Sequence, residues 1–492
     1  MAKSTSSNDS QLLDKIVSLS KRRGFVFQSS EIYGGLNGAW DYGNLGVELL
    51  RNIKDEWWKA MTYRDDVEGI DAAILMHPRV WEASGHVENF TDPMVDCRQC
   101  KSRYRIDILF EDLSVKKQKD ILRDLYPDKF QGQQKDEVIT EAFAKVVESS
   151  QNEMLKVLNC PACGLKGTFT DARKFNLMFK TFVGPVEDSG AAVYLRPETA
   201  QGIFVNFQNI QSASRQKLPF GIAQVGKAFR NEINTKNFLF RTREFEQMEM
   251  QYFVKPGTDE KWFEYWRHER MQWFVDLGMK ADKLQWHRHE AGKLAHYAKD
   301  AYDIEFLFPF GWGEIEGVHN RTDYDLSRHE EFSGKGLKYF DEETKEKFIP
   351  YIIETSAGAS RSFMAFLVNA YNEEDAPTAE GTMERRVVLK LHQKLAPIKA
   401  AIFPLVNRDG MPDIAKKIEK DLCTAFRVFY DDSGAVGRRY RRQDEVGTPY
   451  CITVDSQTLQ DQTVTVRDRD TMIQERIAND KIKEYLFNRL HV

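Results

Sequence analysis

Two stretches with the polar–apolar alternation of extended strands flank an arginine-rich loop within residues 224–253. Successive side chains of a strand point to opposite faces, so Arg230 and Glu232 share one face of the first strand. One face of the second strand carries Phe245, Gln247 and Glu249. If the strands pair as a long hairpin, one sheet face holds an arginine, carboxylates and an aromatic ring. Arginine suits planar phosphate groups, a ring can stack on a base, and a carboxylate can hold an ammonium group. The alternative is a surface hairpin with solvated charges.

Helical spacing appears elsewhere in the first 395 residues. Residues 11–23, 262–277 and 362–371 are predicted to be helices, the last after a buried strand at 350–354 and a small-residue turn at 356–361. A further long helix has an inner stripe predicted to consist of Val47, Leu50, Lys54, Trp57 and Met61. Residues 110–158 are charged and helical in character, with no strong fold signal.

The pattern changes after residue 395. Strands are predicted at 399–406, 451–454 and 463–467, and helices at 413–429 and 470–486. Strands that alternate with helices indicate a mainly parallel, three-layer module. Four segments follow: 1–96, an insertion at 97–165 bracketed by two cysteine pairs, a core at 166–395, and a C-terminal α/β domain at 396–492.

Length and charge set broad limits. A chain of 492 residues is long enough for two or three domains, and its composition suits a globular enzyme. The net charge of −5 neither indicates nor excludes nucleic-acid binding, since local patches decide contact. Two basic clusters stand out, at residues 21–23 and 438–442. No apolar run is long enough to span a bilayer and the first residues are no secretory signal, so we expect no membrane and a cytoplasmic location.

Arg361 falls at the start of a predicted helix, within the strand–turn–helix at 352–366. Free N–H groups and the helix dipole already favour an anion there, and a guanidinium would add a phosphate contact. The small residues before it let a ligand approach the backbone closely. The alternative is a helix start with a surface arginine.

An acidic stretch at residues 310–329 concentrates oxygen ligands, among them Glu314. Mg²⁺ prefers one or two carboxylates plus substrate phosphates, and Glu314 fits that pattern if it lies near the hairpin. The alternative is a solvated acidic loop.

Four of the six cysteines form two C-x-x-C pairs, which in a reducing compartment favours metal over disulfides. Such pairs can supply four thiolates for tetrahedral Zn²⁺ in a closed, structural site. The candidate ligands are Cys97, Cys100, Cys160 and Cys163. Free thiols or a labile disulfide are the alternatives, and the loop between the pairs is longer than in common zinc ribbons. Cys423 and Cys451 lie in apolar segments and are predicted to be core residues.

Common nucleotide signatures are missing. The chain has no G-x-x-x-x-G-K-[ST] phosphate loop and no strand-borne G-x-G-x-x-G fingerprint. It also lacks the His-x-Gly-His and Lys-Met-Ser-Lys-Ser signatures of Rossmann-type synthetases. A nucleotide, if bound, would be held by arginines on an antiparallel sheet.

These segments resemble the three motifs of class II aminoacyl-tRNA synthetases, and the similarity is closest to glycyl-tRNA synthetases of the dimeric, single-chain type. AFRNE at 228–232 and FRTREFEQME at 240–249 resemble motif 2, and residues 354–361 resemble motif 3. YLRPETAQGI at 194–203 is similar to the family's substrate-strand signature. Pro78 is the candidate motif 1 proline, with 84–107 similar to the segment that follows it. Residues 437–455 are similar to the anticodon-binding domain, and 110–158 match least.

The resemblance implies an α+β fold: an antiparallel sheet flanked by helices, with a C-terminal α/β anticodon-binding domain. It implies ATP, Mg²⁺, glycine and tRNA(Gly) as ligands, and a homodimer. Arg230 and Arg361 are implied as catalytic residues, and Glu314 as the Mg²⁺ ligand. The implied ATP-binding residues are Arg230, Asn231, Glu232, Phe240, Arg241, Thr242, Arg243, Glu244, Phe245, Glu314, Ile315, Gly358, Ala359, Ser360 and Arg361. The implied glycine-binding residues are Arg105, Glu198, Phe245, Glu246, Gln247, Met248, Glu249, Glu354, Thr355, Ser356, Ala357 and Gly358.

The implied activity joins glycine to its tRNA through an adenylate. Arg230 is expected at the α-phosphate of ATP, Phe245 stacked on adenine, and Arg361 at the γ end. Two positions depart from the family pattern: Ser360 stands where an acidic residue is usual, and Thr355 where proline is frequent. For tRNA, the cluster at 438–442 offers phosphate contacts and a stacking tyrosine, unless it is a solvated basic loop.

Two rival readings stay open. A non-catalytic relative would bind nucleic acid or a polymerase without making the adenylate, but it would have no use for the combination of Arg230, Glu232 and Arg361. A synthetase for serine, proline, threonine or histidine would keep the fold. The strings around Glu198 and Glu249 favour glycine, because those families share motif 2 only loosely.

Overall fold

A computed structural model describes residues 7–130, 132, 134–185, 192–235, 237–290, 294, 298–377 and 381–490. The chain divides into two compact units. The larger comprises Met1–Met76, Glu198–Phe229 and Thr235–Val492, and the smaller comprises His77–Pro197 and Arg230–Asn234.

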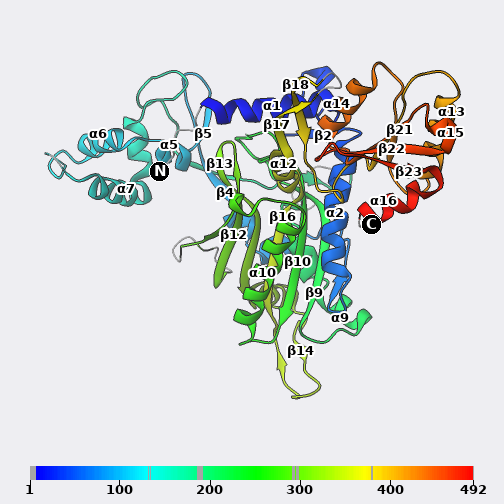
Figure 1. The fold of residues 1–492 in the computed structure, drawn as a ribbon. Coiled ribbons are helices and arrows are strands. Elements are labelled where there is room, and N and C mark those ends of the chain that lie inside the picture. Colours follow the sequence, from blue (N-terminus) through cyan, green and yellow to red (C-terminus); the bar gives the residue numbers. More distant parts are fainter. Residues whose placement is uncertain are drawn as a thin grey trace. The chain divides into compact units, whose positions relative to one another are not determined.

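A seven-stranded sheet is the centre of the larger unit (Figure 1). Its strand order is β11-β12-β13-β16-β10-β9-β3, and every neighbouring pair is antiparallel except β3 with β9. The strands are β3 (Val67–Gly69), β9 (Phe220–Phe229), β10 (Glu244–Val254), β11 (Leu284–Arg288), β12 (Asp300–Phe308), β13 (Gly311–Thr322) and β16 (Tyr351–Gly358). The expected long hairpin is β9–β10, which confirms the antiparallel sheet predicted from alternation.

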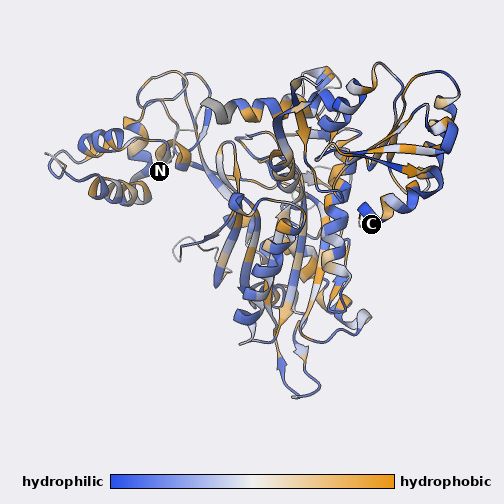
Figure 2. Cartoon of the chain, viewed as in Figure 1, coloured by the Kyte–Doolittle hydropathy of each residue, from blue (hydrophilic) through white to orange (hydrophobic). Residues whose placement is uncertain are grey.

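One face of this sheet carries the main apolar core. It is covered by α2 (Gly46–Thr62), α10 (Asp259–Asp276) and α12 (Ala359–Ala370). Met248, Met250 and Tyr252 of β10 point into this core and are fully buried. Figure 2 shows hydrophobic residues along the central strands and a mixture of hydrophobic and hydrophilic residues along the helices. Burial of this apolar area is the main force that holds the sheet and helices together.

The inner stripe of α2 differs from the predicted one. Leu49 and Ile53 are buried, whereas Val47 is 40% exposed. The reason is the first residue of the helix: a Cβ on Gly46 would lie 1.8 Å from the carbonyl oxygen of Phe25. This close approach turns Gly46 inward and the next residue outward.

The opposite face of the sheet packs against shorter helices. These are α8 (Ala200–Phe204), α9 (Phe207–Ser214) and α11 (Tyr324–Ser333), whose apolar residues join Phe220, Phe253 and Ile352 in a second cluster. On β10, Gln247, Glu249 and Gln251 alternate with the core methionines and therefore lie on this second face.

Smaller elements complete this part of the larger unit. They are α1 (Ser7–Arg23), β1 (Val26–Gln28), η1 (Glu31–Tyr33), β2 (Trp40–Tyr42), η3 (Ala281–Lys283), β14 (Tyr339–Phe340), β15 (Lys347–Phe348), β17 (Tyr371–Pro377) and β18 (Met383–Leu389). β1 pairs with β2, β14 with β15, and β17 with β18, all antiparallel. Strand β16 runs directly into α12 without the predicted separate turn.

The C-terminal part of the unit has a five-stranded sheet of order β20-β19-β21-β22-β23. Its elements are β19 (Ala400–Pro404), α13 (Met411–Leu422), β20 (Val428–Tyr430), α14 (Val436–Val446), β21 (Tyr450–Val454), α15 (Thr458–Asp461), β22 (Thr463–Asp468), β23 (Gln474–Ala478), η5 (Asn479–Lys481) and α16 (Ile482–Leu490). The α/β class is confirmed, but the sheet is mixed: only β20, β19 and β21 are parallel.

The predicted helices at 413–429 and 470–486 are wrong in part. The first ends at Leu422 and is followed by β20, and the start of the second is the edge strand β23. β23 is mostly exposed, so its sequence has little of the apolar alternation that marks a strand. Pairing with β22 specifies it instead.

The smaller unit has its own core. Its elements are α3 (Arg79–Ala83), α4 (His86–Asn89), β4 (Thr91–Asp96), β5 (Arg103–Arg105), α5 (Ile106–Glu111), α6 (Val115–Leu125), α7 (Asp136–Val157), β6 (Arg173–Asn176), β7 (Lys180–Phe182) and β8 (Ala192–Tyr194). Strands β5-β4-β6 form a sheet, and β7 pairs with β8. The helical character predicted for 110–158 is confirmed: α6 and α7 pack together around Leu122, Phe143 and Leu155.

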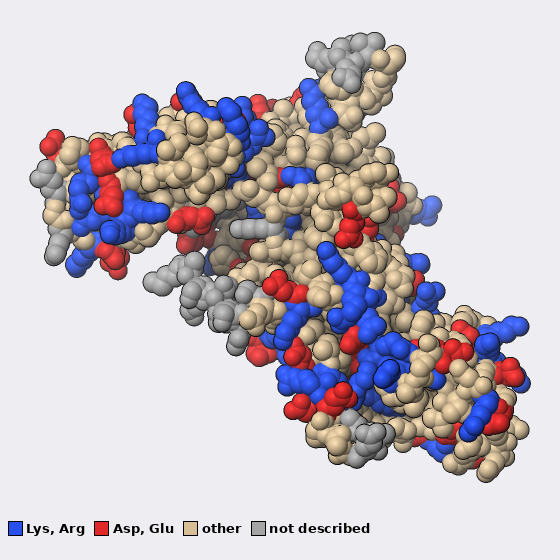
Figure 3. Space-filling model, turned by 90° about the horizontal axis from the view of Figure 1, so that it is seen from above, with Lys and Arg blue, Asp and Glu red and all other residues tan. Residues whose placement is uncertain are grey.

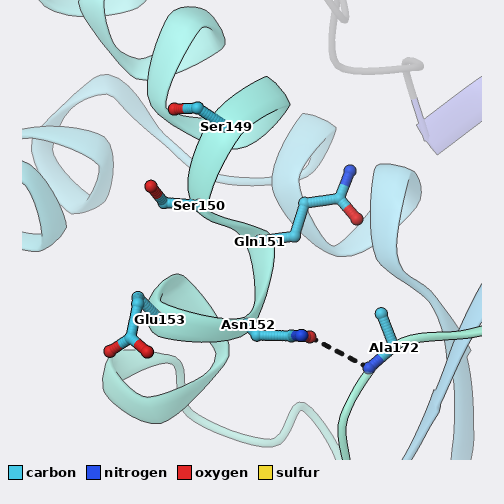
Figure 4. Close-up of a pocket in the computed structure, with 6 residues that line it drawn as sticks. All are labelled: Ser149, Ser150, Gln151, Asn152, Glu153 and Ala172. Carbon is cyan, nitrogen blue, oxygen red and sulfur yellow. Dashed lines mark hydrogen bonds between the residues drawn. The ribbon is translucent and has the colours of Figure 1, made fainter.

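Helix α7 is kinked at Ser150, whose φ of −140° is not helical. A polar hollow lies at the kink, lined by side chains from 149–153 and by Ala172 (Figure 4). The Oδ1 atom of Asn152 accepts a hydrogen bond from the Ala172 amide at 3.0 Å, which ties the kinked turn to the chain that follows.

Candidate active site and metal centre

Three adjacent strands bring polar side chains together on the second face of the large sheet. Strand β16 lies between β10 and β13, and the register sets Glu249 of β10 opposite Ser356. Glu354 lies opposite Gln251 of β10 on one side and His319 of β13 on the other. The pleat therefore brings carboxylates from two strands onto one face, in neighbouring cross-strand pairs.

Glu249 is the most deeply placed of these carboxylates, with 2% of its surface exposed. Oε1 accepts a hydrogen bond from Nε2 of Gln251 at 2.9 Å, and Oε2 accepts one from the Thr199 hydroxyl. Burial, and then the negative charges of Glu354 and Glu198, raise the pKa of Glu249 well above its usual range. A cation that entered this pocket would relieve that repulsion.

Glu354 is held by cations. Oε1 accepts a hydrogen bond from Nδ1 of His319 at 2.6 Å, and Oε2 accepts from Nη1 of Arg321 at 2.9 Å and from Nε2 of Gln251 at 2.7 Å. Burial alone would raise the pKa of Glu354, but Arg321 and His319 more than offset it and lower that pKa below its usual range. Glu354 is thus the charged member of the pair it forms with Glu249.

Glu198 joins the same network through Gln201 of α8. Nε2 of Gln201 lies 2.8 Å from Oε1 of Glu198 and 3.3 Å from Oδ1 of Asp325, and Asp325 forms an ion pair with Arg321. Gln247 accepts a hydrogen bond from the Thr199 amide and donates one to Ser356, at 3.2 and 3.3 Å. The structure therefore brings together Glu198, Gln247, Glu249, Glu354 and Ser356.

Other residues predicted for the ligand pockets point to the opposite face. Met248, Ala357 and Ile315 lie in the main apolar core, and Thr355 is fully buried between the same strands. Glu246 forms an ion pair with Lys54 of α2 at 2.9 Å. Strand alternation is the reason: in β10 and β16 every second side chain leaves the site face.

Arg361, in the first turn of α12, is placed by contacts with Phe240 and Glu314. Its Nε donates to the Phe240 carbonyl at 3.1 Å, and its guanidinium carbon lies 4.6 Å from the centre of the Phe240 ring. Nη1 lies 3.0 Å from Oε2 of Glu314 and also donates to the Glu314 carbonyl at 3.1 Å. Arg361 and Glu314, proposed from sequence for phosphate and Mg²⁺, are therefore direct neighbours.

Aromatic and small residues surround Arg361. Phe240 packs edge-on against Phe308 and Phe310, and Gly313 leaves room for its ring, since a Cβ there would lie 2.8 Å from it. Ser360 accepts a hydrogen bond from the Tyr42 hydroxyl at 2.9 Å. Gly358 is the N-cap of α12, and Ala359 is buried beneath it.

The segment that leads into β10 is polar and well anchored. Thr242 donates to the carbonyl of Glu244 at 3.0 Å, and the Arg243 amide donates to the Gly38 carbonyl at 2.8 Å. Glu244 forms an ion pair with Lys227 across the hairpin. Arg241 and Phe245 are half-buried.

Within the smaller unit, Arg230 follows directly on the last residue of β9. Its Nε donates to the Pro197 carbonyl at 3.0 Å, and its guanidinium carbon lies 5.4 Å from the centre of the Phe90 ring. The Asn231 amide donates to the Leu177 carbonyl at 2.7 Å. Arg230 and Glu232 lie beyond the strand in which alternation had placed them.

Arg105, also in this unit, faces carboxylates. It forms ion pairs with Asp92 at 3.2 Å and with Asp107 at 2.5 Å. The hydrogen bond to Asp107 is the largest influence on Arg105 and raises its pKa, and Glu232 contributes a further negative charge.

The four predicted zinc ligands form one cluster in the smaller unit. The four sulfur atoms of Cys97, Cys100, Cys160 and Cys163 lie within 4.8 Å of one another. The Sγ atoms are 3.8 Å apart for Cys97–Cys163 and 3.6 Å apart for Cys100–Cys160. A tetrahedron of sulfurs about 2.3 Å from Zn²⁺ has edges of about 3.8 Å, so the donor set fits the ion.

The two knuckles have the same local form. The Lys101 amide donates to the Cys97 carbonyl at 2.9 Å, and the Gly164 amide donates to the Cys160 carbonyl at 2.8 Å. Lys101 and Gly164 both have positive φ, 62° and 74°. Each C-x-x-C segment thus curls around its sulfurs in a tight turn that ends in a left-handed residue.

Two predictions about the C-terminal part need correction. Cys423 is exposed, not in the core, because α13 ends just before it; Cys451 is buried as predicted.

The basic cluster at 438–442 is not an open patch. Arg439 is 3% exposed and donates to backbone carbonyls, Tyr440 hydrogen-bonds Thr453, and Arg442 pairs with Asp431. Helical periodicity turns these residues inward, which leaves Arg438 exposed. Figure 3 shows Lys and Arg side chains interspersed with Asp and Glu.

Several residues of the site were not predicted. His319, Arg321, Thr199 and Gln251 all contact the carboxylates described above. The signal for His319 and Arg321 was their alternate spacing on the strand that carries Glu314. Thr199 and Gln251 could be found only once the neighbouring strands were known.

Comparison with protein families places this fold and site in a known class. The family model of the tRNA synthetase class II core domain (G, H, P, S and T) matches residues 179–371. The anticodon-binding domain model matches residues 399–489, and the glycyl-tRNA synthetase insertion domain 1 model matches residues 92–177. The chain therefore has the architecture of a class II aminoacyl-tRNA synthetase.

Similar proteins narrow the class. A glycine–tRNA ligase of Treponema denticola is 54% identical over 96% of this chain and 95% of the relative. Those of Thermobifida fusca and Borreliella burgdorferi are 50% and 52% identical, over 98% and 96% of both chains. The chain belongs to the glycine–tRNA ligase family.

Proposed function

We infer that the protein attaches glycine to its cognate tRNA in two steps, through glycyl-adenylate. One observation supports this function beyond family membership: Glu198, Glu249 and Glu354 share one network, in which burial and then the charges of Glu354 and Glu198 raise the pKa of Glu249. Such a pocket favours a small cation, and the ammonium group of glycine is one.

We propose that Glu198 and Glu249 hold the ammonium group, with Ser356 beside them. We expect a cramped pocket, since Thr199, Gln247 and Gln251 are hydrogen-bonded around the carboxylates. Attraction separates glycine from alanine poorly, since one methyl group is worth only about 1–3 kcal/mol. Exclusion by these close-packed walls discriminates better, because every other amino acid is larger.

For ATP, we propose Arg361 at the γ end of the triphosphate, Phe245 stacked on adenine, and Arg230 at the α-phosphate. The support for Arg361 is its place at the N-terminus of α12, where backbone N–H groups add to its charge. Glu314 is the proposed Mg²⁺ ligand. When bound, Mg²⁺ would supply positive charge to the phosphates.

The chemistry asks little covalent work of the protein. A carboxylate oxygen of glycine attacks the α-phosphorus of ATP. The bond from that phosphorus to the oxygen that bridges it to the β-phosphorus breaks, and pyrophosphate leaves. A terminal ribose hydroxyl of tRNA then attacks the carbonyl carbon, loses its proton, and releases AMP. Positioning by the carboxylate pocket and charge stabilisation by Arg230 and Arg361 account for the acceleration.

We further propose that the four-cysteine cluster holds one structural Zn²⁺. Hydroxyl groups of Thr168 and Ser102 lie 3.2 and 3.3 Å from the sulfurs of Cys97 and Cys100, so they can hydrogen-bond to thiolates. The four sulfurs leave no position for water, which suits structure and not catalysis. Metal analysis of the purified protein tests this: one zinc per chain is expected.

The domain division at 97–165 and near residue 396 remains our proposal, as do tRNA(Gly) binding by the C-terminal domain, a homodimer and a cytoplasmic location. A chain truncated at Ala396 should still form the adenylate but lose efficient tRNA charging. Full charging by that truncation would remove the C-terminal domain from tRNA recognition.

Glycine-dependent exchange between ATP and pyrophosphate tests the activity. The protein should exchange with glycine and not with serine, proline, threonine or histidine. Glu198→Ala should lower the exchange at a given glycine concentration, whereas Glu264→Ala, an exposed helix residue paired with Arg267, should not. No exchange with any amino acid would favour a non-catalytic relative.

A further inference from the structure

His319 forms the shortest described contact to Glu354 and has no role in the function proposed above. Its Nδ1 lies 2.6 Å from Oε1 of Glu354. The two side chains are 18% and 5% exposed, so this bond is shielded from water. Charge-assisted hydrogen bonds in such surroundings are stronger than neutral ones.

The backbone fixes the histidine ring. His319 and Glu354 are direct partners in the β13–β16 register, and the ring lies against Gly317, two residues earlier on the same face. A Cβ at residue 317 would be 3.0 Å from both Cε1 and Nε2 of His319. Glycine at this position therefore gives the ring the room to lie flat and aim Nδ1 at the carboxylate.

The second oxygen of Glu354 is fixed as well. Arg321 and Gln251 donate to Oε2 at 2.9 and 2.7 Å, and the same Gln251 amide donates to Glu249 at 2.9 Å. The orientation of Glu354 is thus transmitted through one amide to the carboxylate that we place at the glycine ammonium. Without the His319 contact, Oε1 would lose its described donor, and the carboxyl group could turn about its last bond.

We propose that His319 is a positioning residue for glycine recognition, which orients Glu354 through Nδ1 and thereby sets the carboxylate pocket. This inference rests on the proposed function, because it assumes that the pocket binds glycine. His319 itself need not touch the substrate. Its effect should fall on glycine binding and leave ATP binding unchanged, since Arg361 and Phe240 make no described contact with it.

The neighbouring pair of His289 and Asp303 provides a matched control. Nε2 of His289 is 2.8 Å from Oδ2 of Asp303, and the ring centres of His289 and His319 are 6.2 Å apart. His289 is 30% exposed and makes no described contact with Glu354. His289 is therefore, like His319, a histidine paired with a carboxylate, but it does not have the role that we propose for His319.

The test is steady-state ATP–pyrophosphate exchange by the full chain, with glycine and ATP varied separately. His319→Leu should raise KM for glycine by roughly 10- to 100-fold, the usual range for a lost charge-assisted hydrogen bond, and leave KM for ATP within about twofold. His319→Asn, whose amide nitrogen can occupy the Nδ1 position, should recover most of the loss. His289→Leu should resemble the unmodified protein.

Two results would overturn the inference: an unchanged KM for glycine in His319→Leu, or a His319→Asn enzyme as impaired as His319→Leu. If His319→Leu does not fold, His319→Ala replaces it with the same expectations. Failure of the proposed function is distinct, because the unmodified protein would then show no glycine-dependent exchange at all.

Discussion

Arg361 and Glu314 form an ion pair, with Nη1 of the guanidinium 3.0 Å from Oε2 of the carboxylate. Arg361 begins α12, and Glu314 lies on β13, so the pair joins the helix start to the sheet. Under the proposed function each partner has a different target: the triphosphate for Arg361 and Mg²⁺ for Glu314. The ion pair then holds both side chains in place until ATP and Mg²⁺ bind and each side chain contacts its own target.

Removal of the Glu314 carboxylate should impair metal-dependent ATP use. We expect Glu314→Gln to raise the Mg²⁺ concentration for half-maximal exchange and to lower the rate by roughly tenfold or more, since one charge-stabilising group is typically worth that much. Glycine KM should change little. The measurement is exchange against Mg²⁺ concentration at saturating glycine and ATP.

Glu305→Gln is the control for this change. Glu305 is the β12 partner of Glu314 in the strand register, but its carboxylate contacts Gln285 and His287. An identical Mg²⁺ dependence for Glu314→Gln and the unmodified protein would rule out Glu314 as the metal ligand.

The His319–Glu354 pair should make stability depend on pH. Burial alone would lower the pKa of His319, but its hydrogen bond to Glu354 and the charge of that carboxylate raise the pKa above 6.5. Arg321 opposes this shift, and Asp303 assists it. Because the folded state binds the proton more tightly, the pair stabilises the fold fully below about pH 6.5 and loses this contribution as pH rises through the folded pKa.

Urea unfolding of the unmodified protein and of His319→Asn at several pH values measures this linkage. The difference in unfolding free energy between the two should be larger at pH 6 than at pH 9, by at most about 1.4 kcal/mol for each unit of pKa shift. A difference independent of pH would show that folding does not shift the pKa of His319.

A buried ion pair on the core side of the sheet should contribute to stability and not to specificity. Nε of Arg270 lies 2.6 Å from Oε1 of Glu316, and the two side chains are 2% and 0% exposed. Burial raises the pKa of Glu316, and the charge and hydrogen bond of Arg270 oppose that rise. Removing one partner leaves an uncompensated buried group.

Arg270→Met alone should therefore cost about 3–5 kcal/mol of unfolding free energy. The double change with Glu316→Leu should recover much of this, since a buried pair can often be replaced by apolar residues. Thermal or urea unfolding measures both variants. Equal losses in the single and double variants would contradict the uncompensated-charge explanation.

Zinc removal should affect the smaller unit first. Cys97→Ser, or a strong chelator, should increase proteolysis within residues 77–197, because four sulfurs tie two distant chain segments together. Cys423→Ser is the matched control, since Cys423 is exposed and outside the cluster. Mass spectrometry of the fragments locates the cleavage. Identical cleavage patterns for Cys97→Ser and Cys423→Ser would argue against a structural metal.

Sequence patterns identified the β9–β10 hairpin, the four-cysteine cluster and the strand–helix unit with Arg361. Each of these has a local signal: alternation, a short cysteine spacing, or small residues before a helix. The group formed by Glu249, Ser356 and Glu354 was implied only through resemblance, because its residues lie on strands about 100 positions apart in the chain. No local pattern specifies such a register.

The errors have physical causes of the same kind. Glu246 and Thr355 belong to motif-like strings, but the pleat turns them away from the site. The arginines at 438–442 were predicted to offer phosphate contacts to tRNA, with a solvated loop as the alternative. In the structure α14 packs against the strands beneath it, and Arg439 donates to the carbonyls of Gly434 and Pro404. β23 was taken for helix because an exposed edge strand carries little apolar pattern.

By itself, the sequence determined the long hairpin, the C-terminal α/β module, the candidate ligands of the metal and the chemical type of the ligand pockets. These depend on residue types and on spacings within single elements, which the chain displays directly. Only the tertiary structure decided which carboxylates meet, which face of each strand reaches them, and that His319 and Arg321 hold Glu354. The reason is that side-chain direction and pKa depend on neighbours supplied by distant strands, and strand pairing is set by the packing of the whole sheet.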